Sequence, residues 1–194
     1  LPRIKIDEPT ISMIFSHNTS PLAGRDGGRF LTSRHLRQRL ELETMTNVGI
    51  KLEVLAEGEG FKVSGRGELH LAILIETMRR EGYELEVSSP QVILIRAGEQ
   101  VLEPMEEVVI EVDEGYQGAV IEALGERKAV MTGMAQTFIG TIRLDFIAPT
   151  RGILGFRSDL LKLTRGTGIM YQNFLRYQKF LGELPSRQVG VLDR

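Results

Sequence analysis

The sequence of 194 residues contains no cysteine and only three histidines. Disulfides and thiolate chemistry are therefore excluded, and the scattered His17, His35 and His70 argue against a closed zinc site. No stretch approaches the roughly 20 consecutive apolar residues of a membrane span, and no charged-then-apolar signal sequence opens the chain. We expect a cytoplasmic protein with no metal, no cofactor of its own and no membrane partner.

A phosphate-binding loop is also missing, because the chain has no Gly-Lys pair and no Asn-Lys-x-Asp segment. The glycine-rich turn from Ser64 to His70 favours a tight strand-to-helix connection with Glu68 at the helix start over a nucleotide site. His70 is expected to be a structural or interface residue. Asp145 and Asp159 lie on different predicted elements and are not expected to form a catalytic pair. No catalytic residue is predicted.

Apolar and charged residues make up 42% and 26% of the chain, an ordinary globular composition. The net charge of −2 argues against a general nucleic-acid binder, but the charges are unevenly distributed. Residues 25–39 sum to +4, residues 99–126 contain nine acids and no base, and residues 127–165 sum to +5. We expect the last of these tracts to form an RNA-facing surface opposite an acidic face, through exposed Arg127, Lys128, Arg151 and Arg157.

Two successive segments share one order of predicted elements, strand-helix-strand-strand-helix-strand. In the first, Leu71, Leu74, Ile75 and Met78 have helical spacing, and Thr32 or Ser33 suits the cap of an earlier helix. The order predicts an α+β fold of two tandem ferredoxin-like (βαββαβ) units, each an antiparallel sheet with helices on one face. The expected boundaries are 1–90 for the first unit, 91–104 for a linker, 105–174 for the second unit and 175–194 for the start of a further domain. The loop from Asn18 to Phe30 is expected to be mobile.

Several motifs together resemble the BipA/TypA family of translational GTPases. In the first unit they are Ser20-Pro-Leu-Ala-Gly24, Thr32-Ser-Arg34, Val63-Ser-Gly-Arg-Gly-Glu-Leu-His-Leu71 and Met78-Arg-Arg-Glu-Gly82. In the second they are Gln117-Gly118, Ala123-Leu-Gly-Glu-Arg-Lys128, Pro149-Thr-Arg-Gly152, Gly155-Phe-Arg-Ser158 and Gly166-Thr-Gly168. The units are similar to elongation factor G domains III and V. Elongation factor G itself places a large domain IV between them, whereas about 15 residues intervene here.

One segment departs from the family pattern. Arg187-Gln-Val-Gly-Val-Leu192 has Val189 where the family's C-terminal domain is expected to have asparagine. The chain starts at Leu1, and we expect a piece of a longer polypeptide that lacks the GTPase domain, the β-barrel domain II and most of the C-terminal domain.

The resemblance implies a parent that hydrolyses GTP on the ribosome and supports ribosome assembly or stress-adapted translation, with GTP and magnesium held by the missing GTPase domain. Its implied partners are rRNA and ribosomal proteins of both subunits, together with its own GTPase domain and domain II. The first unit is expected near the small subunit, the second near the stalk base and the sarcin-ricin loop, and the fragment is expected to be a monomer. The candidate contact residues are Arg25, Arg29, Arg34, Arg37, Arg39, Arg66, Arg127, Lys128, Arg151, Arg157, Lys162 and Arg165.

Two other functions remain open. A ferredoxin-like acyl-phosphate hydrolase would use an arginine in its first loop, a part that Arg25 could play, but no asparagine to orient water is obvious near Ile50 to Val54. Paired ferredoxin-like units also occur as ligand-sensing modules.

Overall fold

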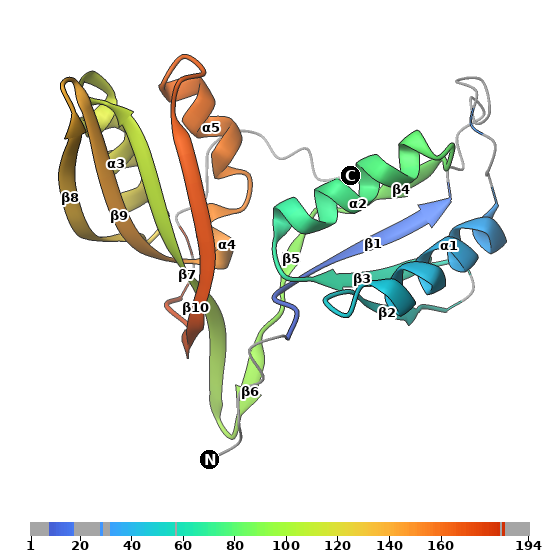
Figure 1. The fold of residues 1–194 in the computed structure, drawn as a ribbon. Coiled ribbons are helices and arrows are strands. Elements are labelled where there is room, and N and C mark those ends of the chain that lie inside the picture. The colour runs from blue at the N-terminus through green and yellow to red at the C-terminus, as the bar shows by residue number, and fades with distance from the viewer. Residues whose placement is uncertain (1–7, 18–27, 29–31, 57, 183, 185–194) are drawn as a thin grey trace. The chain divides into compact units, whose positions relative to one another are not determined.

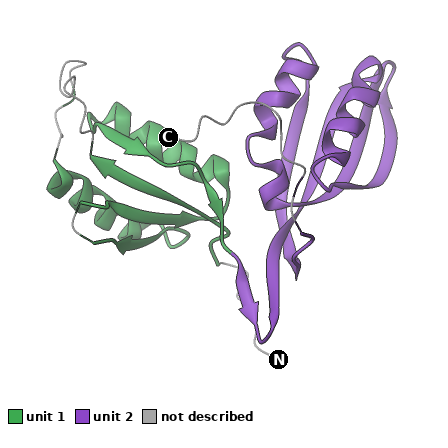
Figure 2. Ribbon diagram, turned by 180° about the vertical axis from the view of Figure 1, so that it is seen from behind, with its two compact units in different colours: residues 1–93 green, residues 94–194 purple. Residues whose placement is uncertain are grey.

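The computed structural model describes residues 8–17, 28, 32–56, 58–182 and 184. The chain divides into two compact units, residues 1–93 and 94–194 (Figure 2). Each unit has its own sheet and its own helices, and each is described by itself below.

The first unit is a five-stranded antiparallel sheet with two helices on one face (Figure 1). The sheet order is β2-β3-β1-β4, and a short strand, β5, also pairs with β1. The elements are β1 (Ile11–His17), α1 (Ser33–Thr46), β2 (Lys51–Val54), β3 (Phe61–Gly65), α2 (Glu68–Arg80), β4 (Leu85–Val87) and β5 (Gln91–Val92).

Local sequence explains both helices of this unit. Thr32 caps α1, because its hydroxyl oxygen accepts a hydrogen bond from the His35 backbone N–H at 3.3 Å. Leu71, Leu74, Ile75 and Met78 of α2 are buried, and the chain turns out of the helix at Gly82, whose φ is +100°. Between the helices, the side chain of Asn47 contacts His70 Nε2 at 2.9 Å. His70 therefore joins the end of α1 to the start of α2, the structural part expected of it.

The second unit repeats the arrangement with longer strands. The sheet order is β10-β7-β9-β8, with β6 paired to β7. This confirms the predicted fold class of two tandem ferredoxin-like units. The elements are β6 (Ile95–Ala97), β7 (Gln100–Asp113), the 3-10 turn η1 (Glu114–Tyr116), α3 (Gln117–Gly125), β8 (Val130–Phe138), β9 (Thr141–Pro149), α4 (Thr150–Ile153), α5 (Phe156–Leu163) and β10 (Ile169–Lys179).

Alternation along the central strands builds the core of this unit. Every second residue from Val108 to Val112 of β7 and from Ile142 to Ala148 of β9 faces the helices and is buried, while the residues between them face the opposite, open side of the sheet. The helices complete the core with Val120 and Leu124 of α3 and Phe156 and Leu160 of α5.

The linker expected over residues 91–104 is instead mostly strand. β5 belongs to the first sheet, and β6 with the start of β7 belongs to the second. Pro104 suggested a break, because proline cannot donate to a sheet ladder. It lies where the partner of β7 changes, since β6 pairs as far as Leu102 and β9 begins at Met105. The missing N–H therefore costs no hydrogen bond to either strand.

The expected end of the second unit at residue 174 is also too early. β10 continues past a bulge after Phe174 and pairs with β7 as far as Lys179. Phe180 then donates its backbone N–H to the Val101 carbonyl at 2.9 Å. Residues 175–180 thus belong to the second unit rather than to a following domain.

Candidate nucleic-acid interface

The predicted contact residues are basic, and the structure places ten of the twelve. Arg25 and Arg29 lie outside the described residues, as does the loop expected to be mobile, apart from Gly28. The acyl-phosphate hydrolase hypothesis depends on Arg25 and therefore stays without a structural test.

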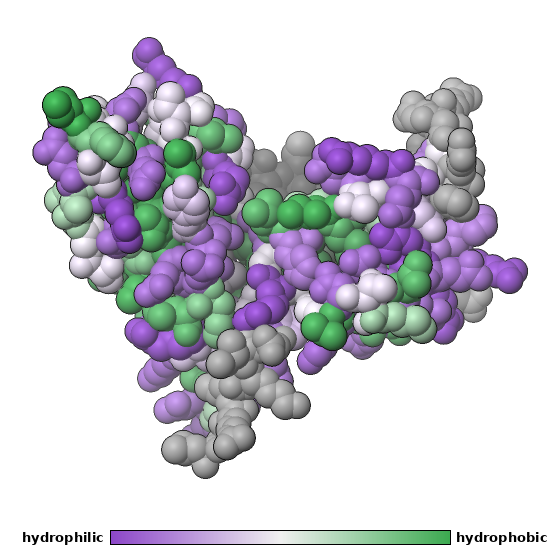
Figure 3. All heavy atoms as spheres, viewed as in Figure 1, coloured by the Kyte–Doolittle hydropathy of each residue, from purple (hydrophilic) through white to green (hydrophobic). Residues whose placement is uncertain are grey.

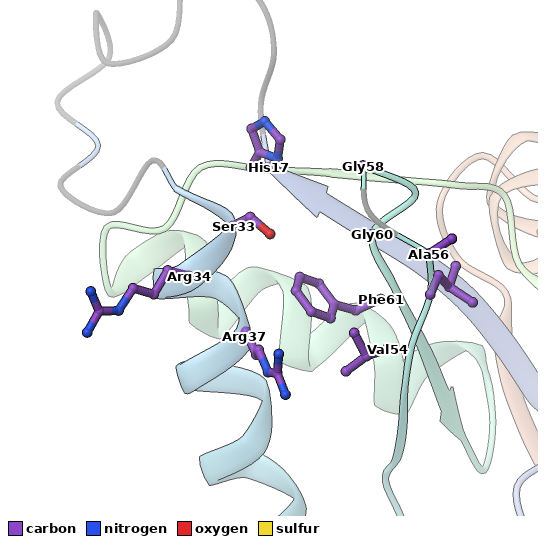
Figure 4. Close-up of a pocket in the computed structure, with 10 residues that line it drawn as sticks. His17, Ser33, Arg34, Arg37, Val54, Ala56, Gly58, Gly60 and Phe61 are labelled. Atoms are coloured by element: carbon purple, nitrogen blue, oxygen red, sulfur yellow. The ribbon is translucent and has the colours of Figure 1, made fainter.

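Two arginines stand at the start of α1. Arg34 and Arg37 line an open pocket of about 510 Å³ between the first turns of α1, the end of β1 and the β2–β3 hairpin (Figure 4). In the close-up, the Arg34 guanidinium points away from Phe61. Arg37 pairs with Glu41 at 2.9 Å, and both side chains are about half exposed. An exposed pair at this helical spacing is weak, on the order of 0.3–0.5 kcal/mol, so a phosphate can compete for Arg37.

Arg39, two residues after Arg37 on α1, forms its ion pairs within the fold. Its guanidinium contacts Glu81 at 2.6 Å and Glu43 at 2.8 Å, and its side chain is 11% exposed. The hydrogen bond with Glu81 raises the pKa of the Arg39 guanidinium above its ordinary value and lowers the pKa of the Glu81 carboxyl. Because Glu81 is the C-cap of α2, this pair ties the two helices together.

Arg66 lies in the exposed turn between β3 and α2. The turn starts with Gly65, whose close contact with Leu71 leaves little room for a side chain, and continues with Gly67 at φ +137°. Arg66 also takes part in an interaction within the chain.

Arg127 is directed into the second unit. Its guanidinium donates to the carbonyls of Gly152 and Leu154, pairs with Asp159 at 2.5 Å and lies 5.0 Å from the Phe156 ring centroid. Only 12% of its side chain is exposed. Arg127 therefore holds the α4–α5 region against the end of α3.

Arg151 is also internal. Its Nε pairs with Glu103 at 3.1 Å, its Nη2 donates to the Gly182 carbonyl, and its guanidinium lies 4.2 Å from the Phe180 ring centroid. The Glu103 side chain is fully buried and also accepts the Leu181 backbone N–H. Glu103 and Arg151 thus bind residues 180–182 to the second sheet.

Lys128 also binds this segment. Its ammonium donates to the Leu181 carbonyl at 2.6 Å. The expectation that Arg127 and Arg151 are exposed RNA-facing charges is wrong, because internal acids and carbonyls occupy both guanidinium groups.

Three of the four exposed cations of the 127–165 tract lie at α5, and the fourth, Arg143, lies on β9 and pairs with Asp145. Arg157, Lys162 and Arg165 are all exposed, on α5 or just after it. Arg157 donates one hydrogen bond to the Met170 carbonyl at 3.1 Å, and it is Arg127, not Arg157, that pairs with Asp159. These three residues are called the α5 cations below. Arg157 is the member of the predicted RNA-facing surface among them, and Lys162 and Arg165 are further candidate contact residues of the same tract.

The acidic tract is likewise not a uniform solvated face. Glu103 and Glu106 are buried on β7. Sequence reasoning missed Glu103 as a structural acid, because its partner lies 48 residues away in the chain.

The described residues contain no group of three or more His, Cys, Asp or Glu side chains that could hold a metal ion. Asp145 pairs with Arg143 at 2.9 Å and Asp159 with Arg127, so each carboxylate has a partner of its own. Among the helices described, none is long and apolar enough to cross a membrane.

Comparison with known proteins adds a family and close relatives. Residues 100–188 match the family described as elongation factor G C-terminus. Over 192 residues, 99% of the chain, the sequence is 51% identical to the large ribosomal subunit assembly factor BipA of Synechocystis sp.. It is 47% identical over 193 residues to proteins of the same name from Salmonella typhimurium and Escherichia coli K12. The chain spans about a third of the length of these curated relatives (32%).

A solved structure from Thermus thermophilus shares the fold. It superposes with a TM-score of 0.55 over 93% of this chain and 42% of that chain, at 15% sequence identity. A likeness at that identity supports the architecture alone.

Proposed function

Because this chain belongs to the BipA/TypA family, we propose that it is the ribosome-docking part of a cytoplasmic translational GTPase that acts in ribosome assembly or stress-adapted translation. Support comes from its similarity, over nearly the whole chain, to proteins named as assembly factors of the large ribosomal subunit. In this proposal GTP and magnesium bind in parts of the parent outside the matched third. The described residues bind and orient, and none of them does chemistry.

The observation that carries the proposal is the set of α5 cations. All three project from one short helix and the turn that follows it, and none has an ion pair among the described residues. Arg165 has a φ of +52°, a conformation that places it on the turn leaving the helix. Arginine and lysine bind phosphate oxygens through charge-assisted hydrogen bonds. A helix and turn that expose three cations in this way suit an rRNA backbone.

A second contact surface lies on the first unit. Arg34 is exposed, and Arg37 has only a weak surface partner in Glu41. Both stand in the first turns of α1, where the helix dipole also favours an anion. We assign Arg34 and Arg37 to phosphate contacts, and we remove Arg39, Arg127 and Arg151 from the docking surface because they hold the fold together.

Salt dependence measures such contacts. Each phosphate neutralised by a cation releases counterions, and log K then falls with log salt by about 0.7–0.9 per contact. Loss of two contacts should therefore flatten the slope by about 1.4–1.8.

The test is pelleting of the chain with purified large subunits, small subunits and 70S ribosomes at several salt concentrations. The variant is Lys162→Gln with Arg165→Asn, since asparagine tolerates the left-handed conformation at residue 165. The matched control is Lys179→Gln with Arg96→Asn, which removes two exposed cations of the same unit outside α5. We expect weaker binding and a flatter slope for the α5 variant alone. Equal losses in both variants would mean that α5 is not the contact.

A further inference from the structure

The edge strand β8 has an unusual composition for its position. It is nine residues long, stands at the end of the second sheet and carries no charged side chain. Figure 1 shows it as the outermost strand of that sheet. Eight of its nine residues are exposed.

The other outer strands of the two sheets are protected in ways that β8 is not. β2 has four residues, two of them charged, and β4 has only three residues. β10 carries Arg176 and Lys179. Short length and charge are the usual means by which proteins prevent an edge from pairing with another chain. β8 has neither, and within the described part of the chain only β9 pairs with it.

Apolar side chains accompany this open edge. Met131 and Met134 are 41% and 49% exposed, and at the hairpin tip Phe138 and Ile139 are 77% and 101% exposed. Figure 3 shows hydrophobic surface at the tip of the β8–β9 hairpin, at the upper left. Exposed apolar groups next to unpaired backbone favour an added strand over a solvated edge.

The open face of the sheet adds a charge preference. Gly133 lies opposite Asp145 in the β8–β9 register, and a Cβ placed on Gly133 would be 3.1 Å from Asp145 Oδ2. A long side chain from a strand outside β8 would therefore pass over Gly133 and reach the carboxylate. There it would compete with Arg143, which pairs with Asp145 at 2.9 Å in an exposed and therefore weak ion pair. At the other end of the strand, Gln136 donates to Glu114 at 2.7 Å, which brings a second acid to the edge.

We propose that β8 is a docking edge for an extended, basic segment of a partner protein, which adds to the second sheet as a further strand. Backbone hydrogen bonds supply the affinity, and lysine or arginine side chains of the segment reach Asp145 on the open face of the sheet or Glu114 on the helix-covered face. This surface differs from the α5 cations in both location and partner class. Its test is therefore independent of RNA docking.

Two other occupants fit the surface less well. RNA would meet Asp145 and Glu114 with no cation on the strand to offset repulsion of its phosphates. A second copy of β8 would bring another uncharged strand and leave both carboxylates without a new partner.

The probe is a nine-residue peptide of alternating lysine and valine with blocked termini, added to the full chain. One matched peptide replaces lysine with glutamate, and another carries N-methyl groups on alternate amides, which removes one row of donors. Binding is measured by titration, and its location by amide hydrogen exchange. We expect the lysine peptide alone to slow exchange in residues 130–138 by about tenfold or more.

Thr132 and Thr137 offer specific blocking positions, because the β8–β9 register skips both at bulges. Proline at Thr132 changes the strand at a position that has no register partner on β9, and Thr132→Pro should abolish peptide binding. Asp145→Asn should weaken binding about threefold and reduce its salt dependence, as expected for one exposed ion pair.

Several outcomes would overturn the proposal even if Thr132→Pro failed to fold. Equal binding of the glutamate or N-methyl peptide would exclude a basic added strand. Protection of β8 by a nine-nucleotide single-stranded RNA would assign the edge to RNA. If exchange in β8 were slow without any peptide, slowed further as the protein concentration rose, and a dimer appeared in sedimentation, the β8 edge would instead bind a second copy of this chain. Loss of ribosome pelleting with peptide binding intact would contradict only the function proposed above.

Discussion

Replacing Arg151 by alanine should destabilise the second unit strongly, although surface charges usually tolerate such a change. Glu103 is fully buried, and Arg151 is its only ion-pair partner within the described residues. Alanine would leave a buried carboxylate that keeps only the Leu181 N–H, at 3.2 Å. It would also remove the cation lying over the Phe180 ring.

The magnitude follows from these contacts. Removing one partner of a buried ion pair costs about 3–5 kcal/mol. Arg151 is 16% exposed, so some water can replace it and the lower end applies. The stacked cation adds about 1 kcal/mol or less. We expect a loss of about 3 kcal/mol, equivalent to roughly a hundredfold increase in the opening equilibrium.

Amide hydrogen exchange in β7 and β10 is the suitable assay, because a chain of two units does not give a single unfolding free energy. Arg157→Ala, which loses one part-buried hydrogen bond to the Met170 carbonyl, is the matched control and should change exchange by less than about fivefold. Glu103→Met with Arg151→Met should restore most of the protection, because an apolar pair replaces a buried ionic one. The reasoning would be refuted if Arg151→Ala left amide exchange unchanged and flattened the salt dependence of ribosome binding. Arg151 would then be an RNA contact residue.

Three further predictions concern acid stability, glycine packing and nucleotide binding. Because Arg39 lowers the pKa of Glu81, the stabilisation from this pair is fully present above the ordinary glutamate pKa of about 4.3 and is lost as pH falls through the lower folded value. Urea unfolding of the first unit between pH 3 and 6 should show this loss in the wild type and not in Glu81→Gln. Gly152→Ala should destabilise the second unit by more than about 1 kcal/mol, measured by amide hydrogen exchange in β7 and β10, since its Cβ would lie 2.4 Å from the Arg127 carbonyl oxygen. Gly118→Ala, in open space on α3, should be neutral or stabilising by roughly 0.5–1 kcal/mol in that assay. Calorimetry with GTP should show no saturable micromolar binding, because the chain has no Gly-Lys pair.

The order of the elements could be read from the sequence because each signal is local. Helical spacing from Leu71 to Met78 and the cap at Thr32 depend on neighbours within one or two turns. Strand length could not be read in the same way. The N–H lost at Pro104 is harmless only because β6 stops pairing before it and β9 starts after it, which is a property of the assembled sheet.

The candidate interface was less predictable, because a cation looks the same in sequence whether it faces water or an acid. Arg127 pairs with Asp159, 32 residues away in the sequence, and Arg151 pairs with Glu103, 48 residues away. Charge patterning along the sequence carries no information over such separations. The α5 cations were found because a tract that sums to +5 must expose some of its charge. The open edge at β8 was missed, because absence of charge marks an edge only once the strand order is known.

The long pairing of β7 with β10 has a consequence for how the second unit forms during synthesis. β6 can meet β7 almost at once, since Ala97 and Gln100 are neighbours in the chain, but Leu102 must wait for Lys179. Pairings between distant residues form late because a long loop has to close first. A ribosome translating this protein will therefore release β7 with one side unpaired, and the sheet can close only after residue 179 has left the exit tunnel.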